Sequence, residues 1–296
     1  MAGDLISKTF LFIGFSFTDP NLDYVLSRLH TTTKRTHYCF MKAEPIDPLE
    51  DEEVQKYRKR KQELRVDDLK RYGIQTLLID DYAEIPKILQ AIENRVLKRT
   101  IFVSGSAETF GAWERQEALN FIHTLAADLI RADLRIVNGF GWGIGSAVIN
   151  GSLEAIYASP EKFNEDQLVI RPFPQFPTKD QELSTLWEEY RQRMISLSGI
   201  AIFLFGNKSG PNGSIDLANG VLREFQICVD LGRIPIPVGV TGFAAEQIAN
   251  TVLAAPEKYY VGITWIIPLI HEICDPRIPR SELVKKLINI IQLLGR

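Results

Sequence analysis

The sequence predicts an α/β protein whose main part is a doubly wound, mostly parallel sheet with helices on both faces. Strand-like apolar runs alternate with helix-like segments along the 296 residues, as in a parallel sheet. This alternation restarts at Thr100, after a helical pattern that ends near Leu97. Small-residue turns follow several predicted strands, and ligands of such sheets bind at the carboxyl edge. We therefore expect two units, with residues 1–98 in the first and residues 99–296 in the second.

In the first unit we expect a buried, central strand over Thr9–Phe15. A helix should open at Asp19-Pro20 and run to about His30, because Asp is a good N-cap residue and Pro suits the first helical position. The remaining expected elements are strands over Arg35–Met41 and Ile74–Ile79 and helices over Glu50–Tyr72 and Ile85–Leu97.

In the second unit the same patterns predict a longer βα series. The expected strands are Thr100–Ala107, Leu134–Asn138, Gln167–Ile170, Gly199–Phe205, Ile234–Val240 and Thr264–Ile270. The expected helices are Trp113–Ala132, a helix from the glycine-rich turn to Ala158, Leu183–Leu197, Ile215–Leu231, Gly242–Leu253 and Arg280–Leu294. The segment Asn207–Gly213 reads as a polar loop.

Composition bounds the function classes. Hydrophobic residues make up 45% and charged residues 24% of the chain, which is ordinary for a globular protein. The net charge of −3 gives no basic excess for nucleic-acid binding. Three scattered cysteines indicate a reducing cytoplasm rather than a disulfide framework. No metal-ligand spacing and no apolar run of about 18 residues occurs, so we expect no metal and no membrane span.

The first candidate binding site is the turn that ends the strand at residue 100. Ser104, Gly105, Ser106 and Ala107 form this turn. Small residues allow the backbone to approach a phosphate group, free N–H groups can point at it, and the two hydroxyls add donors. A tight turn without a ligand explains the same residues equally well.

The second candidate is a glycine-rich loop that follows a strand and opens a helix. Gly139, Gly141, Gly143 and Gly145 alternate with other residues around Trp142. The spacing differs from that of the dinucleotide-binding motif. Since each glycine costs backbone entropy, four of them favour phosphate or ribose contact over a purely structural turn. Trp142 would either stack on a base or lie buried.

Four further residues follow strands or lie on the adjoining helices. Arg171 and Phe173 come after a strand, and Phe173 is placed to stack on a purine. Arg191 suits phosphate through its guanidinium fork. Lys208 follows the most apolar strand, and Glu224 lies in a helix where it can accept ribose hydroxyls or pair with an arginine. The alternatives are that Arg171 is an ordinary surface arginine and that Arg191 lies on an ordinary amphipathic helix. We favour a binding site because all of these residues are expected at the carboxyl edge of one sheet.

These residues resemble those of the SLOG superfamily, which includes the lonely-guy phosphoribohydrolases and DprA-like proteins. Tyr190-Arg191 occupies the place of the family's Arg-Lys pair, Met194 matches a family methionine, and Glu224 matches the family glutamate. The resemblance implies a Rossmann-like nucleotide-binding fold from residue 99 on. The family's P-G-G-x-G-T loop is replaced by Gly206–Ser214, which argues against hydrolase chemistry.

The first unit resembles the C-terminal part of a bacterial sirtuin-like (SIR2) NADase domain. The resemblance rests on Leu5–Tyr24, where Gly14-Phe15-Ser16 matches a stretch that lines the NAD site. Gly14 and Ser16 are therefore the expected remnant of an NAD site. The Gly-Ala-Gly turn, the catalytic Asn/Asp and the catalytic His of that family have no counterpart here, so we expect no catalytic residue and no NAD hydrolysis from this chain alone.

A SIR2-like domain followed by a SLOG domain is similar to the layout of the Thoeris anti-phage effectors. The resemblance implies that a TIR-domain partner makes a cyclic ADP-ribose isomer, which the SLOG domain (STALD) binds. A homo-oligomer, a dimer or tetramer and possibly a filament, then rearranges and the SIR2 domain hydrolyses NAD. Carried over by position, the implied contacts are Ser104–Ala107, Gly139–Gly145, Arg191, Lys208 and Glu224.

Two other functions fit parts of the sequence. A phosphoribohydrolase would use Glu224 on nucleoside 5′-monophosphates, against which the lost loop counts. A DprA-like binder of single-stranded DNA would need a basic, aromatic surface, against which the net charge of −3 counts.

Overall fold

The computed structural model describes residues 7–15, 17, 35–45, 48–177 and 182–295. The chain divides into two compact units, Met1–Ile92 and Glu93–Arg296. The division falls within helix α4 (Ile85–Leu97). The boundary predicted from the sequence lies just after the end of this helix.

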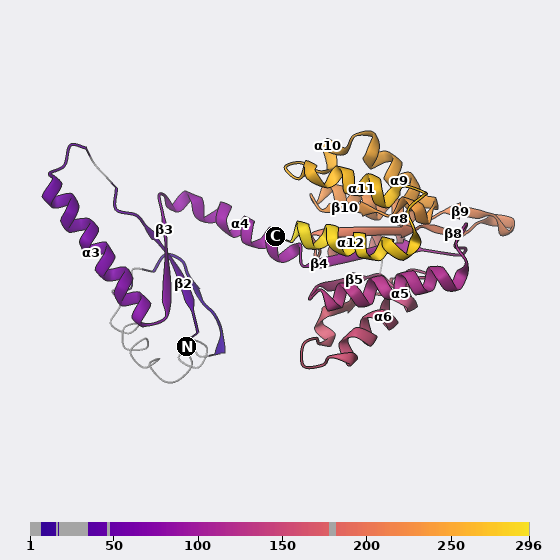
Figure 1. The fold of residues 1–296 in the computed structure, drawn as a ribbon, viewed down its shortest axis with the longest axis horizontal. Coiled ribbons are helices and arrows are strands. Elements are labelled where there is room, and N and C mark those ends of the chain that lie inside the picture. The colour runs from indigo at the N-terminus through magenta and orange to yellow at the C-terminus, as the bar shows by residue number, and fades with distance from the viewer. Residues whose placement is uncertain (1–6, 16, 18–34, 46–47, 178–181, 296) are drawn as a thin grey trace. The chain divides into compact units, whose positions relative to one another are not determined.

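The first unit contains a parallel three-stranded sheet and one long helix (Figure 1). The sheet has the order β1 (Leu11–Phe12), β2 (His37–Lys42) and β3 (Ile74–Ile79). Helix α3 (Glu52–Arg71) begins at Asp51, whose side chain accepts a hydrogen bond from the Glu53 amide. Asp side chains satisfy the free amides of a first turn in this way, so the helix start is encoded locally.

The strand expected over residues 9–15 is wrong in length and in place. β1 has only two residues and lies at the edge of the described sheet, and within it only Phe12 is buried. Leu11, Ile13 and Phe15 are exposed. The run of apolar residues suggested a long buried strand. Apolar character alone does not show that only Leu11 and Phe12 pair with β2. Ser16 and the whole helix expected from Asp19 to His30 lie outside the described residues.

The second unit is built on a parallel sheet, as the sequence predicted, but with five strands in place of the six expected. Its strands are β4 (Thr100–Ser106), β5 (Arg135–Asn138), β6 (Leu168–Ile170), β7 (Ile200–Phe205) and β10 (Ile234–Pro237). The spatial order is β10-β7-β4-β5-β6. The first strand of the unit therefore lies in the middle, and the chain reverses its direction of winding there. Ligands of such sheets bind in the crevice where the order reverses.

Helices cover both faces of this sheet. They are α5 (Arg115–Arg131), α6 (Gly145–Ala158), α7 (Leu183–Ile195), α8 (Asn219–Asp230), α9 (Phe243–Ala254), α10 (Pro256–Tyr259), α11 (Ile267–Cys274) and α12 (Arg280–Leu294). Figure 1 shows α5 and α6 on one side and α8 to α11 on the other. The central strand β7 is completely buried between these layers. No helix in the described part of the chain is long and apolar enough to cross a membrane.

Two expectations in the second unit are wrong. The segment expected as a last strand, 264–270, forms a short 3-10 turn and the start of α11. Ile266, Ile270 and Ile273 are buried at helical spacing, and Pro268 stands in the first turn, where proline is tolerated. The polar loop after β7 instead forms an antiparallel hairpin of β8 (Asn207–Ser209) and β9 (Ile215–Leu217), so α8 begins later than predicted.

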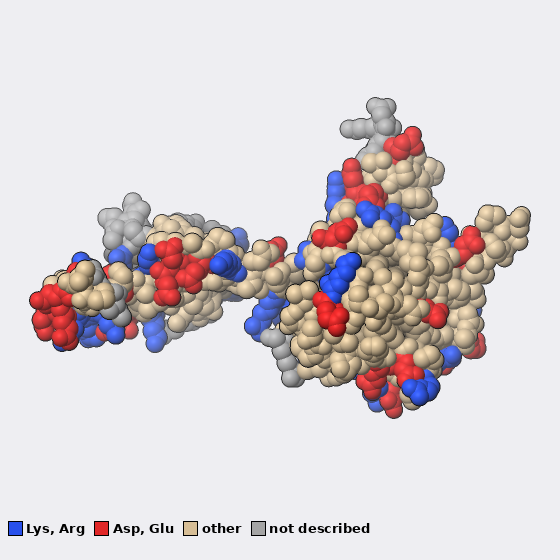
Figure 2. All heavy atoms as spheres, turned by 90° about the horizontal axis from the view of Figure 1, so that it is seen from above, with Lys and Arg blue, Asp and Glu red and all other residues tan. Residues whose placement is uncertain are grey.

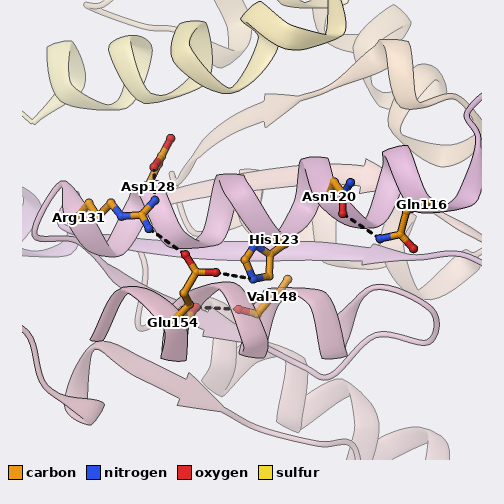
Figure 3. Close-up of polar contacts among 8 residues, drawn as sticks. Gln116, Asn120, His123, Asp128, Arg131, Val148 and Glu154 are labelled. Carbon is orange, nitrogen blue, oxygen red and sulfur yellow. Dashed lines mark hydrogen bonds and ion pairs between the residues drawn. The ribbon is translucent and has the colours of Figure 1, made fainter. Parts of the chain in front are cut away.

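Helices α5 and α6 pack closely, and Gly151 makes this possible. A Cβ atom on Gly151 would lie 2.1 Å from the carbonyl oxygen of His123. Beside this crossing, His123 Nε2 lies 3.2 Å from one carboxylate oxygen of Glu154, and Arg131 lies 3.1 Å from the other (Figure 3). Glu154 therefore links α6 to two residues of α5. The close approach of the two helices at Gly151 is possible because glycine has no side chain.

We predict that Gly151→Ala lowers the free energy of unfolding by about 2 kcal/mol, because the added methyl group overpacks the crossing. Intrinsic helix propensity would favour alanine by about 1 kcal/mol, so the sign of the change distinguishes the two effects. Asn150→Ala, at an exposed position of the same helix, is the control and should change stability by a few tenths of a kcal/mol. Denaturant melts measure both. An unchanged or raised stability of the Gly151 variant would contradict the packing explanation.

Candidate binding site at the carboxyl edge of the sheet

The candidate site centres on a buried carboxylate beside the middle strand. Glu224, from α8, is only 7% exposed. It accepts a hydrogen bond of 2.6 Å from the hydroxyl of Ser104 in β4, and its other oxygen lies 3.6 Å from Nε of Arg191 in α7. Three elements that are distant in sequence thus meet beside β4, the strand at which the sheet reverses its winding order.

Arg191 is held by an aromatic ring and a glycine. Its guanidinium carbon lies 5.0 Å from the centre of the Phe173 ring, within the range of a cation–π interaction. A Cβ on Gly220 would lie 3.1 Å from one of its terminal nitrogens, so glycine there leaves room for the guanidinium. Nε of Arg191 is buried and has no hydrogen-bond partner among the described residues. A buried donor without a partner is costly, and an anionic ligand would satisfy it.

The environment of Glu224 favours its neutral form. Burial raises the pKa of this carboxyl above its ordinary value, while the Ser104 hydrogen bond and the charge of Arg191 act in the opposite direction. Burial is the largest of these effects.

The turn after β4 is braced by the protein itself. The amides of Glu108 and Thr109 donate to Oδ1 of Asn207, and the amide of Ala107 donates to the carbonyl of Trp142. The hydroxyl of Ser106 donates to the carbonyl of Asn207. Within the predicted turn of Ser104–Ala107, the amide of Ala107 is therefore not free, so the expectation of a free donor is wrong for that residue.

The glycine-rich loop has a steric explanation that the sequence did not reveal. A Cβ on Gly141 would lie 2.0 Å from the carbonyl oxygen of Gly105, and one on Gly143 would lie 2.0 Å from that of Ala107. A Cβ on Gly139 would lie 2.8 Å from the ring of Phe173. The glycines thus let this loop pack against the first turn. Packing accounts for them without a ligand, and phosphate or ribose contact at this loop stays a prediction.

The remaining predicted residues are distributed around these contacts. Trp142 is 71% exposed, and Phe140 beside it is half-exposed with a positive φ of 58°. Lys208 is exposed on the β8–β9 hairpin. Arg171 is half-buried, and its amide donates to the carbonyl of Asn138. The structure brings Ser104, Glu224, Arg191 and Phe173 into mutual contact; these other residues make no direct contact with that cluster among the described interactions.

Two asparagines that hold the site together were not singled out from the sequence. Asn138 is buried, donates to the carbonyl of Val103 and accepts from the amide of Phe140, so it ties the glycine-rich loop to β4. Asn207 ties the β4 turn to the end of β7. An asparagine directly after an apolar strand was the available signal for both. Among the described residues, no group of three metal-ligating side chains occurs.

The strand order and the buried polar cluster define the class of this protein: a doubly wound α/β module with a buried polar cluster at its topological switch point. The chain belongs to the Sir2- and TIR-associating SLOG family, whose model matches residues 84–294. A second family model, the SIR2-like domain, matches residues 2–68.

Similar proteins share this layout. The chain is 43% identical over 299 residues to an NAD(+) hydrolase ThsA from Bacillus cereus, a match that covers 100% of this chain and 62% of the relative. It is 40% identical over 305 residues to an NAD(+) hydrolase ThsA from Cytobacillus dafuensis, covering 99% and 62%. A third protein of that name, from Acinetobacter baumannii, is 38% identical over 270 residues, covering 88% and 56%. The chain therefore spans about three fifths of the length of these relatives.

The buried carboxyl predicts a pH dependence of stability. Because the pKa of Glu224 is raised in the folded protein, the folded state binds more protons than the unfolded state above about pH 4.5, the ordinary value. Stability from this group is therefore present at low pH and falls as pH rises towards the folded pKa. Glu224→Gln keeps an acceptor for Ser104 but does not ionise.

We expect the stability of Glu224→Gln relative to the unmodified chain to increase as pH rises from about 4.5 to 7. Thermal melts across this range measure the difference. Glu189→Gln, at a more exposed position on α7, is the control and should show a much smaller trend. A difference that decreases with rising pH would mean that the Arg191 ion pair outweighs the cost of burial.

Proposed function

We propose that the second unit is the sensor module of an anti-phage effector and binds a cyclic ADP-ribose isomer at the carboxyl edge of its sheet. The observation that carries this proposal is Arg191 Nε, a buried cationic donor without a hydrogen-bond partner at the switch point. Together with Glu224 and Ser104 it offers both a phosphate-binding group and a hydroxyl acceptor in one crevice.

The chemistry of the crevice suits a nucleotide diphosphate. Arg191 supplies a charge-assisted donor for phosphate, and exposed Lys208 adds a second positive charge at the end of β7. Glu224 is placed to accept a ribose hydroxyl. The exposed ring of Trp142 offers a stacking surface for a base, and Phe173 holds Arg191 rather than stacking on a purine itself.

The activity of a longer protein follows as part of the same proposal. The relatives are NAD(+) hydrolases, and the SIR2-like segment at residues 2–68 supports NAD as the substrate of such an assembly. In this proposal a TIR-domain protein makes the nucleotide second messenger, and a cytoplasmic homo-oligomer rearranges when it binds. Gly14 and Ser16 remain the proposed remnant of the NAD site. The 296-residue chain assayed alone is expected to release no nicotinamide from NAD.

A phosphoribohydrolase acting on nucleoside monophosphates is the second candidate, favoured by the burial of Glu224 beside Ser104. The hairpin of β8 and β9 stands where those hydrolases carry their glycine-rich loop, which supports a receptor over a hydrolase. Release of free base from AMP would favour the hydrolase. Figure 2 shows acidic and basic side chains interspersed on the face in view, which lends no support to DNA binding there.

Calorimetry with purified chain and cyclic ADP-ribose isomers tests the proposal. We expect a Kd of about 1 μM or lower, which corresponds to roughly −8 kcal/mol. Arg191→Ala and Lys208→Ala should each weaken binding by about 1–3 kcal/mol, as the loss of a charge-assisted contact does.

Arg193→Ala is the matched control, because Arg193 lies on the same helix as Arg191 and is mostly exposed. Its affinity should equal that of the unmodified chain. Lys208 is exposed, so its variant keeps the fold and separates lost binding from lost stability. Absence of heat and of a thermal shift with every isomer would refute the proposal.

A further inference from the structure

A second cavity lies at the opposite edge of the same sheet, where the strands begin. It has a volume of about 340 Å³. Gly199 and Ile234, which stand at the starts of β7 and β10, line it together with the last residues of α4. This edge is remote from the glycine-rich turns, which all follow the ends of strands. The cavity therefore belongs to a different site from the one proposed above.

The polar lining of this cavity is cationic. Lys98, Arg233 and Lys258 line it, and no aspartate or glutamate does. None of the three forms an ion pair with a described carboxylate, although most of the buried or half-buried cations elsewhere in this unit have one. Lys258 lies 5.5 Å from the ring centre of Tyr259, which also lines the cavity. Three neighbouring positive charges repel one another, and an anion between them would relieve that repulsion.

Arg233 provides the most specific sign of an absent anion. Its Nε is buried and has no hydrogen-bond partner among the described residues. One of its terminal nitrogens donates to the carbonyl of Ser196 over 3.3 Å, which is a long bond. The planar guanidinium therefore keeps donors unsatisfied at the cavity wall. A phosphate group accepts from two donors of such a fork at once.

The ends of neighbouring helices do not account for these charges. Helix C-termini lie at this edge and attract cations through their free carbonyls. In α8, however, the amides of Gly232 and Arg233 already donate to the carbonyls of Val229 and Cys228. The amide of Gly199 likewise donates to the carbonyl of Leu97 at the end of α4. These helix-terminal carbonyls thus already accept hydrogen bonds from backbone amides, so Lys98, Arg233 and Lys258 remain available to a ligand.

We propose that this cavity binds a small organic phosphate no larger than a nucleoside monophosphate. Its volume lies at the lower end of the range for small-molecule sites. Val229, Pro235, Val261 and Ile263 provide apolar walls, and Tyr259 a ring, for the organic part. Arg233 and Lys98 bind the phosphate.

The position of the site gives binding a consequence. Asn94, Leu97 and Lys98 belong to the end of α4 and the residue after it, and the division between the two compact units falls within this helix. A phosphate held by Lys98 and Arg233 ties the end of α4 to the start of β10. Occupancy therefore makes the last turn of α4 more rigid, which slows exchange of its amide hydrogens.

Inorganic phosphate and AMP are the probes, titrated into the whole chain at constant ionic strength. We expect AMP to bind, with amide exchange slowed at residues 94–98. Arg233→Gln and Lys98→Gln should each raise the Kd for AMP at least tenfold. Arg277→Gln is the control, because Arg277 is an exposed arginine paired with Asp275 away from the cavity. A thermal melt of each variant verifies its fold, and exposed Lys258→Gln tests the site should Arg233→Gln not fold.

Arg191→Gln separates this site from the one at the carboxyl edge. AMP binding that survives Arg191→Gln but is lost in Arg233→Gln and Lys98→Gln supports the proposal. Binding that is lost in Arg191→Gln and unchanged in the other variants places AMP at the carboxyl edge and overturns it. Failure of the unmodified chain to bind either probe at millimolar concentration overturns it as well.

Discussion

The arrangement of the second unit is organised around one buried polar contact, in which the carboxyl group of Glu224 meets Ser104 and Arg191. Each partner comes from a different element, and each is largely withdrawn from water. Burying a carboxylate is costly unless it is paired and hydrogen-bonded, and removal of one partner of a buried pair typically costs several kcal/mol. α7, α8 and β4 therefore have to meet in one register for this contact to form.

The surrounding loops follow from the same constraint. The glycine-rich loop packs directly on the β4 turn because Gly141 and Gly143 have no side chains to hold them apart. Asn138 and Asn207 then tie both turns to the strand ends with side-chain hydrogen bonds. In the β4 turn, the amides of residues 107–109 are already bonded within the protein.

Sequence patterns predicted the fold class and most of its elements. The all-apolar run of β7 and the restart of the alternation at β4 identified a parallel sheet with helices on both faces, and the structure confirms it. The pattern failed where a short apolar run is compatible with either a strand or a helix, since residues 264–270 are helical. It also failed for β1, which is short and lies at an edge of its sheet. It also missed the β8–β9 hairpin, because a polar segment of that length carries little periodicity.

For the candidate site, the sequence by itself identified the polar residues that stand where a ligand could bind. Ser104, Arg191 and Glu224 were identifiable because they stand at strand ends or on the helices after them, where parallel sheets place ligands. Only the tertiary structure decided that these three touch, that Phe173 holds Arg191, and that the glycines serve packing. It alone also revealed the cationic cavity at the opposite edge. Contacts between residues more than a hundred positions apart depend on strand order and helix packing, which local patterns do not encode.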